Sequence, residues 1–524
     1  MSRKKSTFAV LVAAFLLCSL NPAPLLANST ASAPSDGGNF PDQADDGDFA
    51  LQADPDRYRM FFPIMFASSS QAPRCDHMID PGISVANTRT CFSDVRPGDT
   101  VCIAAGHRGD LSLRSFKGTP DKPIVFVNYG GQVIIDSKRH HGIHVIDSQF
   151  FRLTGTGTVG TDYGIKIVGS TGVGVRIGFK SSDFEIDHVE VTGMGGAGIS
   201  AKTESVCSDG STNNYDYDGD GIIEGDLDDV VNRDNFTQVN SVFHHNYIHR
   251  VGSEGFYVGN CYLGRDVSCG HGTETIYDPL LQGVSIYDNI VTDTGWDAIQ
   301  VASAIEDCEI HHNRILRDSQ GAVEHQQGGV MNAQGSVCDI YNNLIRDGGG
   351  AGIYVHGHGG NRVYNNVIVN AGQNAALGNN GGDGIAIGTG SNPGNGVYVL
   401  HNTIVSPANF GVGFFNRKGH DNTIQNNIVV DPGNYAIYGK SAYVQTWGRT
   451  NVLATNNLTT RTVADVKFKD PTSGDFSIQP DSPAVDYGID PSVEVVATDF
   501  FGISRPQGLG YDVGAYELEF PPRP

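Results

Sequence analysis

Basic residues are scarce in this sequence of 524 residues. It has 35 Lys and Arg against 58 Asp and Glu, which gives a formal net charge of −23 at pH 7. A surface of that sign repels the phosphates of nucleic acids and of anionic membranes, so nucleic acid is not an expected partner. The spacings Cys-x-x-Cys and His-Glu-x-x-His are also absent. Their absence argues against a zinc site or a thiol-redox function.

Long apolar runs are scarce as well. The run at residues 8 to 20 follows a start with three basic residues and is interrupted by Asn21 and Pro22. A membrane-spanning helix needs about 20 apolar residues, whereas a charged start and a short apolar run are typical of a secretory signal peptide. We therefore expect residues 1–27 to be a signal peptide, and the mature protein to be secreted or displayed at the cell surface.

The cysteine content fits export. Cys18 would leave with the signal peptide, and the other eight cysteines are an even number in an oxidising compartment. This indicates disulfides, although the sequence alone does not choose their pairing.

Residues 28–72 are rich in Asp, Ala, Ser and Gly. A segment of this composition buries too little apolar surface to fold, so we predict a flexible acidic spacer. The apolar patch at residues 60–66 leaves a second interpretation open, a strand that docks on the body of the protein or on a cell-surface partner.

A six-residue pattern recurs in the middle of the chain. An apolar residue is followed by two polar or aromatic residues, an Asn, any residue, and a β-branched aliphatic residue. We interpret the Asn as a structural residue at a bend, which tolerates left-handed dihedrals and hydrogen-bonds its equivalent in the next repeat. An eighth copy, residues 184–189, has Asp187 in place of Asn. In the other seven copies the Asn residues are Asn246, Asn289, Asn313, Asn343, Asn366, Asn402 and Asn427.

Successive copies of this Asn are 23 to 43 residues apart, and repeats of that length indicate a solenoid. The Leu-x-x-Leu-x-Leu frame of leucine-rich repeats is absent, and β-branched residues between Gly and Asn turns favour strands. A third segment in each repeat, such as residues 352–356, alternates as a strand does. We therefore predict an all-β fold, a single-stranded right-handed parallel β-helix with three strands per coil and with N- and C-terminal caps. Cys308 and Cys338 should stack in adjacent coils, as a disulfide or as buried thiols.

Two parts of the chain resemble known groups. The repeats over residues 73–455 resemble the right-handed parallel β-helix proteins of the pectate-lyase-like superfamily. The tail resembles the choice-of-anchor Q module of secreted bacterial β-helix proteins, which implies attachment to the cell envelope. The tail motifs are Ser482-Pro483-Ala484-Val485-Asp486, Thr498-Asp499-Phe500-Phe501-Gly502, Arg505-Pro506 and Tyr511-Asp512-Val513-Gly514-Ala515-Tyr516-Glu517.

The expected organisation follows from the repeats and the tail. An open solenoid end exposes unpaired strand edges, so both ends need a cap. We expect residues 73–135 to form the N-terminal cap and first coils. Residues 136–455 would form the β-helix, with insertions at 203–238 and 259–281, and residues 456–524 a C-terminal capping and anchor-like module.

The side chains of a β-helix fill its core, so a ligand has to lie on an outer face or in a groove walled by insertions. Aligning the third segments by their inward residues puts Glu254 and Asp297 at equivalent places in adjacent coils, about 4.8 Å apart at the backbone. Such a pair suits the acid and nucleophile of a retaining glycosidase, or a cation site against a uronate. The two like charges should also raise one pKa. The alternative is that both residues cap turns.

Other candidates surround this pair. Lys202 should point outward one coil earlier, where it would resemble the Lys base of β-helix polysaccharide lyases; the alternative is a solvated surface lysine. His325 is a further candidate for proton transfer. The candidate substrate-binding residues are Tyr257, Trp296, Gln300, Tyr354, His356 and Asp383.

Residues 216–229 contain alternating carboxylates with a Gly at the sixth place, as in the first half of an EF-hand loop. Leu227 stands where the bidentate Glu belongs, which excludes a complete EF-hand. Calcium would stabilise the groove wall here, and the alternative is a solvated acidic loop. The expected calcium ligands are Asp216, Asp218, Asp220, Glu224, Asp226 and Asp228.

Together these features predict a secreted, monomeric, carbohydrate-active protein that binds and cleaves a polysaccharide, with an acidic polysaccharide as one option. Structural calcium is the expected cofactor. Lyase, hydrolase and epimerase chemistries all remain open, because the fold does not fix the function. The alternative class is a non-catalytic surface protein, an adhesin or glycan-binding β-helix.

Overall fold

The computed structural model describes residues 73–137, 141–212, 225, 227, 229–374, 376, 381–388, 396–417, 419–491 and 496–519. These residues belong to one compact unit, residues 69–524. The expected signal peptide (1–27), the acidic spacer (28–72) and its apolar patch lie outside the described residues. So do all six expected calcium ligands, Asp216, Asp218, Asp220, Glu224, Asp226 and Asp228.

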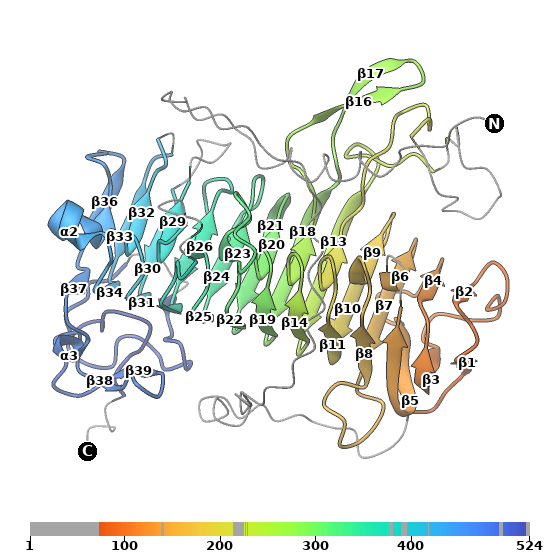
Figure 1. The fold of residues 1–524 in the computed structure, drawn as a ribbon, viewed down its shortest axis with the longest axis horizontal. Helices are drawn as coiled ribbons and strands as arrows, with labels where there is room; N and C mark the ends of the chain where they lie inside the picture. Colours follow the sequence, from red (N-terminus) through yellow and green to blue (C-terminus); the bar gives the residue numbers. More distant parts are fainter. Residues whose placement is uncertain are drawn as a thin grey trace. The chain divides into compact units, whose positions relative to one another are not determined.

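Short strands wind in successive coils around a common core (Figure 1). One coil consists of β13 (Thr237–His244), β14 (Tyr247–Val251) and β15 (Phe256–Val258). Each pairs in parallel with its equivalent in the next coil, β18 (Leu280–Tyr287), β19 (Ile290–Thr294) and β20 (Ile299–Val301). The predicted all-β parallel β-helix with three strands per coil is confirmed.

The first two strands of each coil belong to a 23-stranded sheet and the third to a 12-stranded sheet. The 23-stranded sheet also contains β1 (His77–Ile79), β3 (Thr100–Arg108), β5 (Ile124–Asp136), β7 (Gln149–Thr154), β8 (Ile165–Val168), β10 (Ser182–Asp187), β11 (Val189–Thr192), β21 (Ala304–His311), β22 (Arg314–Leu316), β24 (Cys338–Tyr341), β25 (Leu344–Arg346), β27 (Arg362–Tyr364), β28 (Val367–Val369), β30 (Tyr398–Leu400), β31 (Thr403–Val405), β33 (Asn422–Gln425), β34 (Ile428–Val430), β36 (Val452–Thr455) and β37 (Leu458–Thr460). The 12-stranded sheet also contains β2 (Val85–Asn87), β4 (Leu111–Arg114), β6 (His141–Ile146), β9 (Val173–Gly178), β12 (Ile199–Ala201), β23 (Gly328–Asn332), β26 (Ala351–Val355), β29 (Ile385–Ile387), β32 (Val412–Phe414) and β35 (Val444–Gln445).

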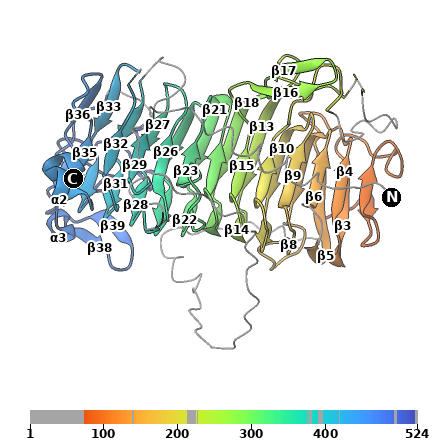
Figure 2. The ribbon, with the colours of Figure 1, turned by 45° about the horizontal axis from the view of Figure 1, so that its top comes forward.

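The remaining elements lie in the insertions and the tail. The second insertion carries the antiparallel hairpin of β16 (Arg265–Cys269) and β17 (Gly272–Ile276), which both views place beyond the edge of β13 and β18 (Figures 1 and 2). The C-terminal part contains α2 (Tyr435–Tyr438), η4 (Gly439–Ala442), α3 (Val463–Val466), β38 (Phe468–Asp470) and β39 (Asp475–Ile478). No helix in the described part of the chain is long and apolar enough to span a bilayer.

Inward-facing aliphatic residues stack from coil to coil and form the core. The alignment predicted for the third strands is confirmed, because Ile199, Phe256, Ile299, Val330, Ile353 and Ile385 are successive partners in the register. All six are fully buried, so each coil removes apolar surface of its neighbours from water. Cys308 and Cys338 form a disulfide between adjacent coils, and further disulfides join Cys75 to Cys102 and Cys207 to Cys269.

The repeated Asn side chains form a hydrogen-bonded ladder at the bend between the first and second strands. Asn313 Nδ2 donates to Asn343 Oδ1 at 3.0 Å and to the carbonyl of Ile286 at 2.8 Å. The predicted coil-to-coil bond is therefore confirmed, and the ladder extends to Asn457, which was not predicted. Its members are Asn246, Asn289, Asn313, Asn343, Asn366, Asn402, Asn427 and Asn457.

Two details of the predicted bend are wrong. The left-handed residue is the one before the Asn, such as His312 with φ 55°, and not the Asn itself. Asp187 is not in the ladder, because it pairs with His244 while the amide of Val189 meets Asn246 Oδ1 at 3.1 Å. Inward and outward residues alternate along a strand, so an alignment shifted by two residues keeps the same inward and outward pattern. The sequence pattern therefore did not show that the ladder position is two residues after Asp187.

The tail packs along the side of the coils. Its backbone meets side chains at the bends: Asn365 Nδ2 donates to the carbonyl of Thr498 at 2.8 Å, and Thr403 Oγ1 accepts from the amide of Ala515 at 2.9 Å. Inside the tail, Arg505 donates to Glu517 at 2.9 Å and to the carbonyl of Gly514 at 2.8 Å, with both charged side chains fully buried. The motif residues thus hold the tail onto the solenoid.

Replacing an interior ladder residue should be costly. Asn343 is fully buried. Asn343→Ala would leave three backbone groups without partners: the N–H of Asn313 in the adjacent coil and the carbonyls of Ile310 and Tyr341. Each unpaired buried group costs about 1–3 kcal/mol, so we expect the free energy of unfolding to fall by roughly 2–4 kcal/mol. Urea unfolding followed by circular dichroism measures the change. Asn235→Ala, at an exposed turn, is the matched control, and an equal effect of both variants would contradict the structural role of the ladder.

The buried pair in the tail makes a second prediction. Arg505→Met would leave Glu517 buried and unpaired, which should cost about 3–5 kcal/mol and release the tail to limited proteolysis. Arg461→Met is the control, because Arg461 and Asp431 form an exposed pair at 2.8 Å and such pairs contribute about 1 kcal/mol or less. Unchanged protease resistance of the Arg505→Met variant would show that the tail is held by other contacts.

Candidate functional site

The outward residues of the third strands form one column. Tyr257, Gln300, Met331 and Tyr354 are successive partners in the register, so three of the predicted substrate-binding residues lie on one face of the 12-stranded sheet. Tyr257 and Gln300 are buried, whereas Tyr354 is half-buried. His356 is half-buried too and packs edge-on against Tyr354, with ring centroids 6.0 Å apart.

Lys202 lies at the start of the first insertion and contacts the outward ring of Tyr257, but it is buried, so the alternative of a solvated surface lysine is wrong. Its Nζ is 3.3 Å from Glu204 Oε1 and 4.2 Å from the centre of the Tyr257 ring. Burial lowers the pKa of Lys202, but Tyr257 and Glu204 outweigh this and the net shift is upward. The charge of Lys202 in turn holds the pKa of Glu204 at about 2. A lysine that is kept protonated is a poor general base.

Glu254 and Asp297 stand in adjacent coils at the turn before the third strand, as predicted, but they do not face outward. Their exposed fractions are 1% and 0%. The side chain of Asp297 points toward the equivalent turn of the next coil, where its Oδ1 accepts a hydrogen bond from the backbone N–H of Gly328 at 2.6 Å. Asp383 does the same with the amide of Phe410 at 3.2 Å. The turn-capping alternative therefore describes Asp297, and the predicted pair lies in adjacent coils but is closed to solvent.

Burial changes the ionisation of these carboxyls. It raises the pKa of Asp297 well above the usual range, and the charges of Glu254 and Asp318 add to the shift. Burial also raises the pKa of Glu254, and it raises the pKa values of Asp318 and Asp383 to about 7. Glu254 Oε1, Asp297 Oδ2 and Asp318 Oδ2 have no hydrogen-bond partner among the described residues. Glu254, Asp297 and Asp318 thus form a carboxyl row of three buried acids whose pKa values are all raised.

Asp318 was missed in the sequence because it belongs to no repeated pattern. Its carboxyl occupies the space above Gly348 of the next coil, where a Cβ atom would lie 2.2 Å from Oδ2. The three successive glycines at residues 348–350 were the available signal. A run of glycines in a strand turn often marks the close approach of another group.

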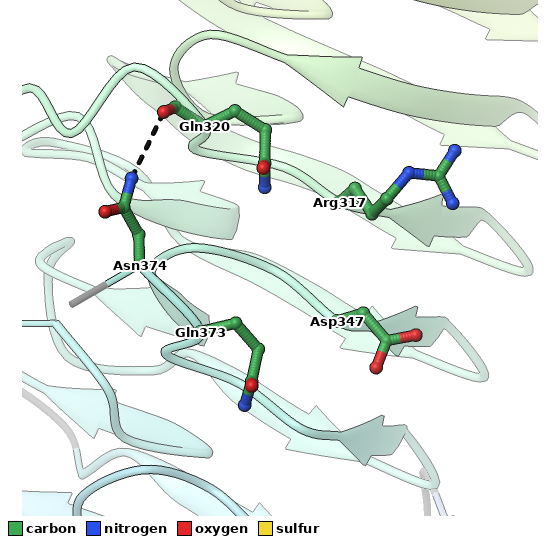
Figure 3. A pocket seen from close by; sticks show the side chains of 5 residues that line it. All are labelled: Arg317, Gln320, Asp347, Gln373 and Asn374. Atoms are coloured by element: carbon green, nitrogen blue, oxygen red, sulfur yellow. Dashed lines mark hydrogen bonds between the residues drawn. The ribbon is translucent and has the colours of Figure 1, made fainter.

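A polar pocket of about 470 Å³ lies at the turns after the second strands of three consecutive coils (Figure 3). Arg317 Nε and Nη2 donate to Asp293 at 2.6 and 2.8 Å, and Asn374 Nδ2 donates to the carbonyl of Gln320 at 3.1 Å. Guanidinium and amide groups of this kind bind hydroxyls and carboxylates. Sequence reasoning did not find this pocket, whose lining residues are Arg317, Gln320, Asp347, Gln373 and Asn374.

The pocket and the carboxyl row are carried by the same turn. Asp318 directly follows Arg317 in the chain, and the next residue, Ser319, donates its amide to the carbonyl of Trp296 at 2.9 Å. Trp296 is half-buried and is the residue before Asp297. Of the predicted residues, the structure therefore brings Trp296 and Asp297 close to the pocket through their backbone.

His325 stands apart from the carboxyl row. It is exposed, and its ion-pair partner is Glu324, at 3.7 Å. Among the described residues it has no hydrogen bond to Glu254, Asp297 or Asp318. The structure therefore adds no support for a role of His325 in proton transfer.

Solved structures that resemble this chain share little sequence with it. No protein-family model and no curated protein matches the sequence. Pectate lyase Pel9A is 13% identical, with a TM-score of 0.42 over 86% of this chain and 98% of that one. The GH136 lacto-N-biosidase from Eubacterium ramulus is 12% identical, with a TM-score of 0.42 over 70% and 63%. A PL6 family polysaccharide lyase from Pseudopedobacter saltans is 12% identical, with a TM-score of 0.39 over 77% and 96%. Likenesses of this size carry no argument about activity.

The raised pKa of Asp318 predicts a pH-dependent stability. A carboxyl with a folded pKa near 7 and an ordinary value of 3.8 favours the folded state when protonated, and this contribution is lost as the pH rises from about 4 to 7. Asp318→Asn, which stays neutral, should match the wild type at pH 4 and exceed its stability at pH 8, by on the order of 2–4 kcal/mol.

Chemical unfolding at the two pH values measures this difference, with the exposed Asp234→Asn as the control. A variant that differs from the wild type by the same amount at both pH values would show that Asp318 titrates normally.

Proposed function

We propose that this protein is an extracellular carbohydrate-active protein that binds a polysaccharide at the pocket lined by Arg317 and cleaves the bound chain. The observation that carries the proposal is the carboxyl row Glu254, Asp297 and Asp318 beside that pocket. Each of these residues is buried with one unpartnered oxygen. Leaving such groups unpaired costs about 1–3 kcal/mol each, and strongly perturbed carboxyls cluster at functional sites.

The chemistry that this row supports is proton donation. A carboxylic acid kept neutral at pH 7 can protonate the glycosidic oxygen of a departing sugar, which is the acid step of glycoside hydrolysis. Glu254 and Asp297, in adjacent coils, are the proposed acid and its partner. The protonated state of Lys202 weakens a lyase mechanism that uses it as base, so hydrolysis is the better supported of the two reactions.

Binding would come from the pocket and the rings near it. Arg317 keeps N–H donors beyond its bond to Asp293, and Gln320, Gln373 and Asn374 offer amides to sugar hydroxyls. Trp296, Tyr257, Gln300, Tyr354 and His356 stay proposed as further contacts on the neighbouring turns.

Export, calcium and envelope attachment belong to the proposal on the sequence alone. The apolar start of the chain supports secretion, and the acidic loop at residues 216–228 supports a structural Ca²⁺ with Asp and Glu oxygens as ligands. The tail supports attachment only through its resemblance to anchor-like modules. No catalytic step depends on the ion.

The burial of the carboxyls favours a second candidate function. Glu254 and Asp297 are 1% and 0% exposed, so a substrate reaches them only if the turns open. A protein that holds a glycan without cutting it needs no such opening. In that case the carboxyl row would have only a structural role. The protein would be a surface or adhesion protein that binds a glycan at the pocket.

A panel of polysaccharides tests cleavage against binding. The purified mature protein should release reducing ends from at least one of pectate, alginate, xylan or a host-type glycan, and Glu254→Gln and Asp297→Asn should each lower the turnover about 100-fold or more. Absorbance from unsaturated uronates would identify a lyase instead. Parallel assays with a calcium chelator test the ion.

Glu324→Gln, an exposed carboxyl outside the row, is the matched control. Full turnover by the Glu254→Gln and Asp297→Asn variants would reject the row as the catalytic site. Binding without turnover by the wild type, measured by affinity electrophoresis, would favour the second candidate.

A further inference from the structure

Four aromatic rings gather near the C-terminal end of the coils, away from the pocket described above. The centroid of the Trp447 ring lies 5.8 Å from Phe410, 5.9 Å from Tyr438 and 6.1 Å from Phe415. The rings come from three places: the coil of β32, the helix α2, and the turn after β35. In Figures 1 and 2, α2 lies beside the last coils.

The outer part of this cluster is open to solvent. Trp447 is 46% exposed and Tyr438 is 39% exposed, whereas Phe410 beneath them is 6% exposed. The cluster is therefore supported from below and presents two large rings outward. Exposed apolar groups that are gathered in one place mark binding surfaces more often than isolated ones do.

Trp447 has a left-handed backbone conformation, as many turn residues of this solenoid do. Its φ is 54°, in the left-handed region that bulky residues rarely adopt. The amide of Trp447 donates to Gln445 Oε1 at 3.0 Å, which fixes the turn.

Two arginines follow these aromatic residues in the chain. Arg417 follows Phe415 by two residues, and Arg449 follows Trp447 by two. Arg449 Nη1 donates to the carbonyls of Phe414 and Thr446 at 3.1 and 3.3 Å. Burial lowers the pKa of Arg449, and the charge of Arg417 lowers it further. Among the described residues neither guanidinium forms an ion pair with a carboxylate.

This local excess of positive charge is unusual in a chain of net charge −23. Two guanidinium groups that repel each other without a counter-charge are suited to an anionic ligand, which would bind both. The adjoining rings can take the apolar C–H face of a pyranose. The rings would contact the apolar face of an acidic sugar, and the guanidinium groups would bind its anionic group.

We propose that Tyr438, Trp447, Arg417 and Arg449 form a second saccharide-binding site, which binds an acidic sugar unit of a polysaccharide. The indole of Trp447 stacks on the sugar ring, and the guanidinium groups bind its carboxylate or sulfate. The site itself rests on the observations above, and only the polymer as its natural ligand rests on the proposed function. A chain bound here and at the pocket would be held at two places, which raises the effective concentration at each.

The tryptophan content makes the site directly observable. The chain has two tryptophans, Trp296 and Trp447, so Trp296→Phe leaves Trp447 as the sole tryptophan, whose emission is excited selectively over that of the tyrosines. Titration of this variant with hexagalacturonate should change its emission saturably, whereas xylohexaose should bind more weakly. In calorimetry, Trp447→Ala should weaken hexagalacturonate binding about tenfold or more. Arg417→Gln with Arg449→Gln should remove the preference for the acidic sugar.

Controls separate binding from folding and from cleavage. Trp447→Phe should retain most of the affinity, Lys467→Gln removes an exposed positive charge elsewhere, and circular dichroism verifies that each variant is folded. If no turnover is found while Trp447 still responds to acidic oligomers, the proposed function fails and this site stands. If the emission of Trp447 responds to none of hexagalacturonate, alginate hexamer or chondroitin sulfate hexamer, the site is overturned whatever the turnover.

Discussion

Coil-to-coil stacking is the interaction on which everything else in this protein depends. Each coil is too short to bury its own apolar residues, and only the coil above and the coil below remove them from water. The Asn ladder supplies hydrogen bonds at the bend between the first and second strands, where strand pairing is interrupted. At that bend the residue before the Asn has a left-handed conformation. The side-chain amide of the Asn donates hydrogen bonds to backbone carbonyls that have no partner in the strands. Apolar stacking and polar ladder thus support the same register.

Stacking also explains the unusual chemistry of the turns. Residues far apart in the chain become neighbours at about the strand spacing, so Glu254 and Asp297 occupy equivalent positions in adjacent coils although they are 43 positions apart in the chain. Because the turns pack on each other as the strands do, such side chains lose their water. Glu254, Asp297 and Asp318 then shift toward their neutral forms chiefly through burial, and at Asp297 the charges of Glu254 and Asp318 add to the shift.

The sequence was sufficient for the fold and for the alignment of the coils. A repeated Asn and a period-two alternation determine which residue lies above which, and Ile199 to Ile385 fall into the predicted stack. It was insufficient for the direction of polar side chains at turns. Alternation decides in or out along a strand, but a turn residue such as Asp297 is placed by the nearest unpaired amide, here that of Gly328. Nothing in the local pattern shows that amide.

The same limit explains which candidates were missed or misjudged. Lys202 looked like a surface lysine in the sequence because the insertion that covers it has no regular pattern. In that insertion, Glu204 forms an ion pair with Lys202. Asp318 and the pocket at Arg317 depend on glycines and amides from three coils, so no single window of sequence contains them. Trp447 carried no repeat signal, and its neighbours Phe410 and Tyr438 come from other turns.

The tail restricts where ligands can bind. It attaches at the bends between the first and second strands, through Asn365, Thr403 and Asn426, and it covers that side of the C-terminal coils. The bends of the middle coils instead carry rings that stack on each other, such as Tyr287 on His311 at 5.0 Å and Tyr341 on Tyr364 at 4.9 Å. Rings that face each other have no free face for a sugar. Both proposed saccharide sites lie instead at the turns on either side of the third strands.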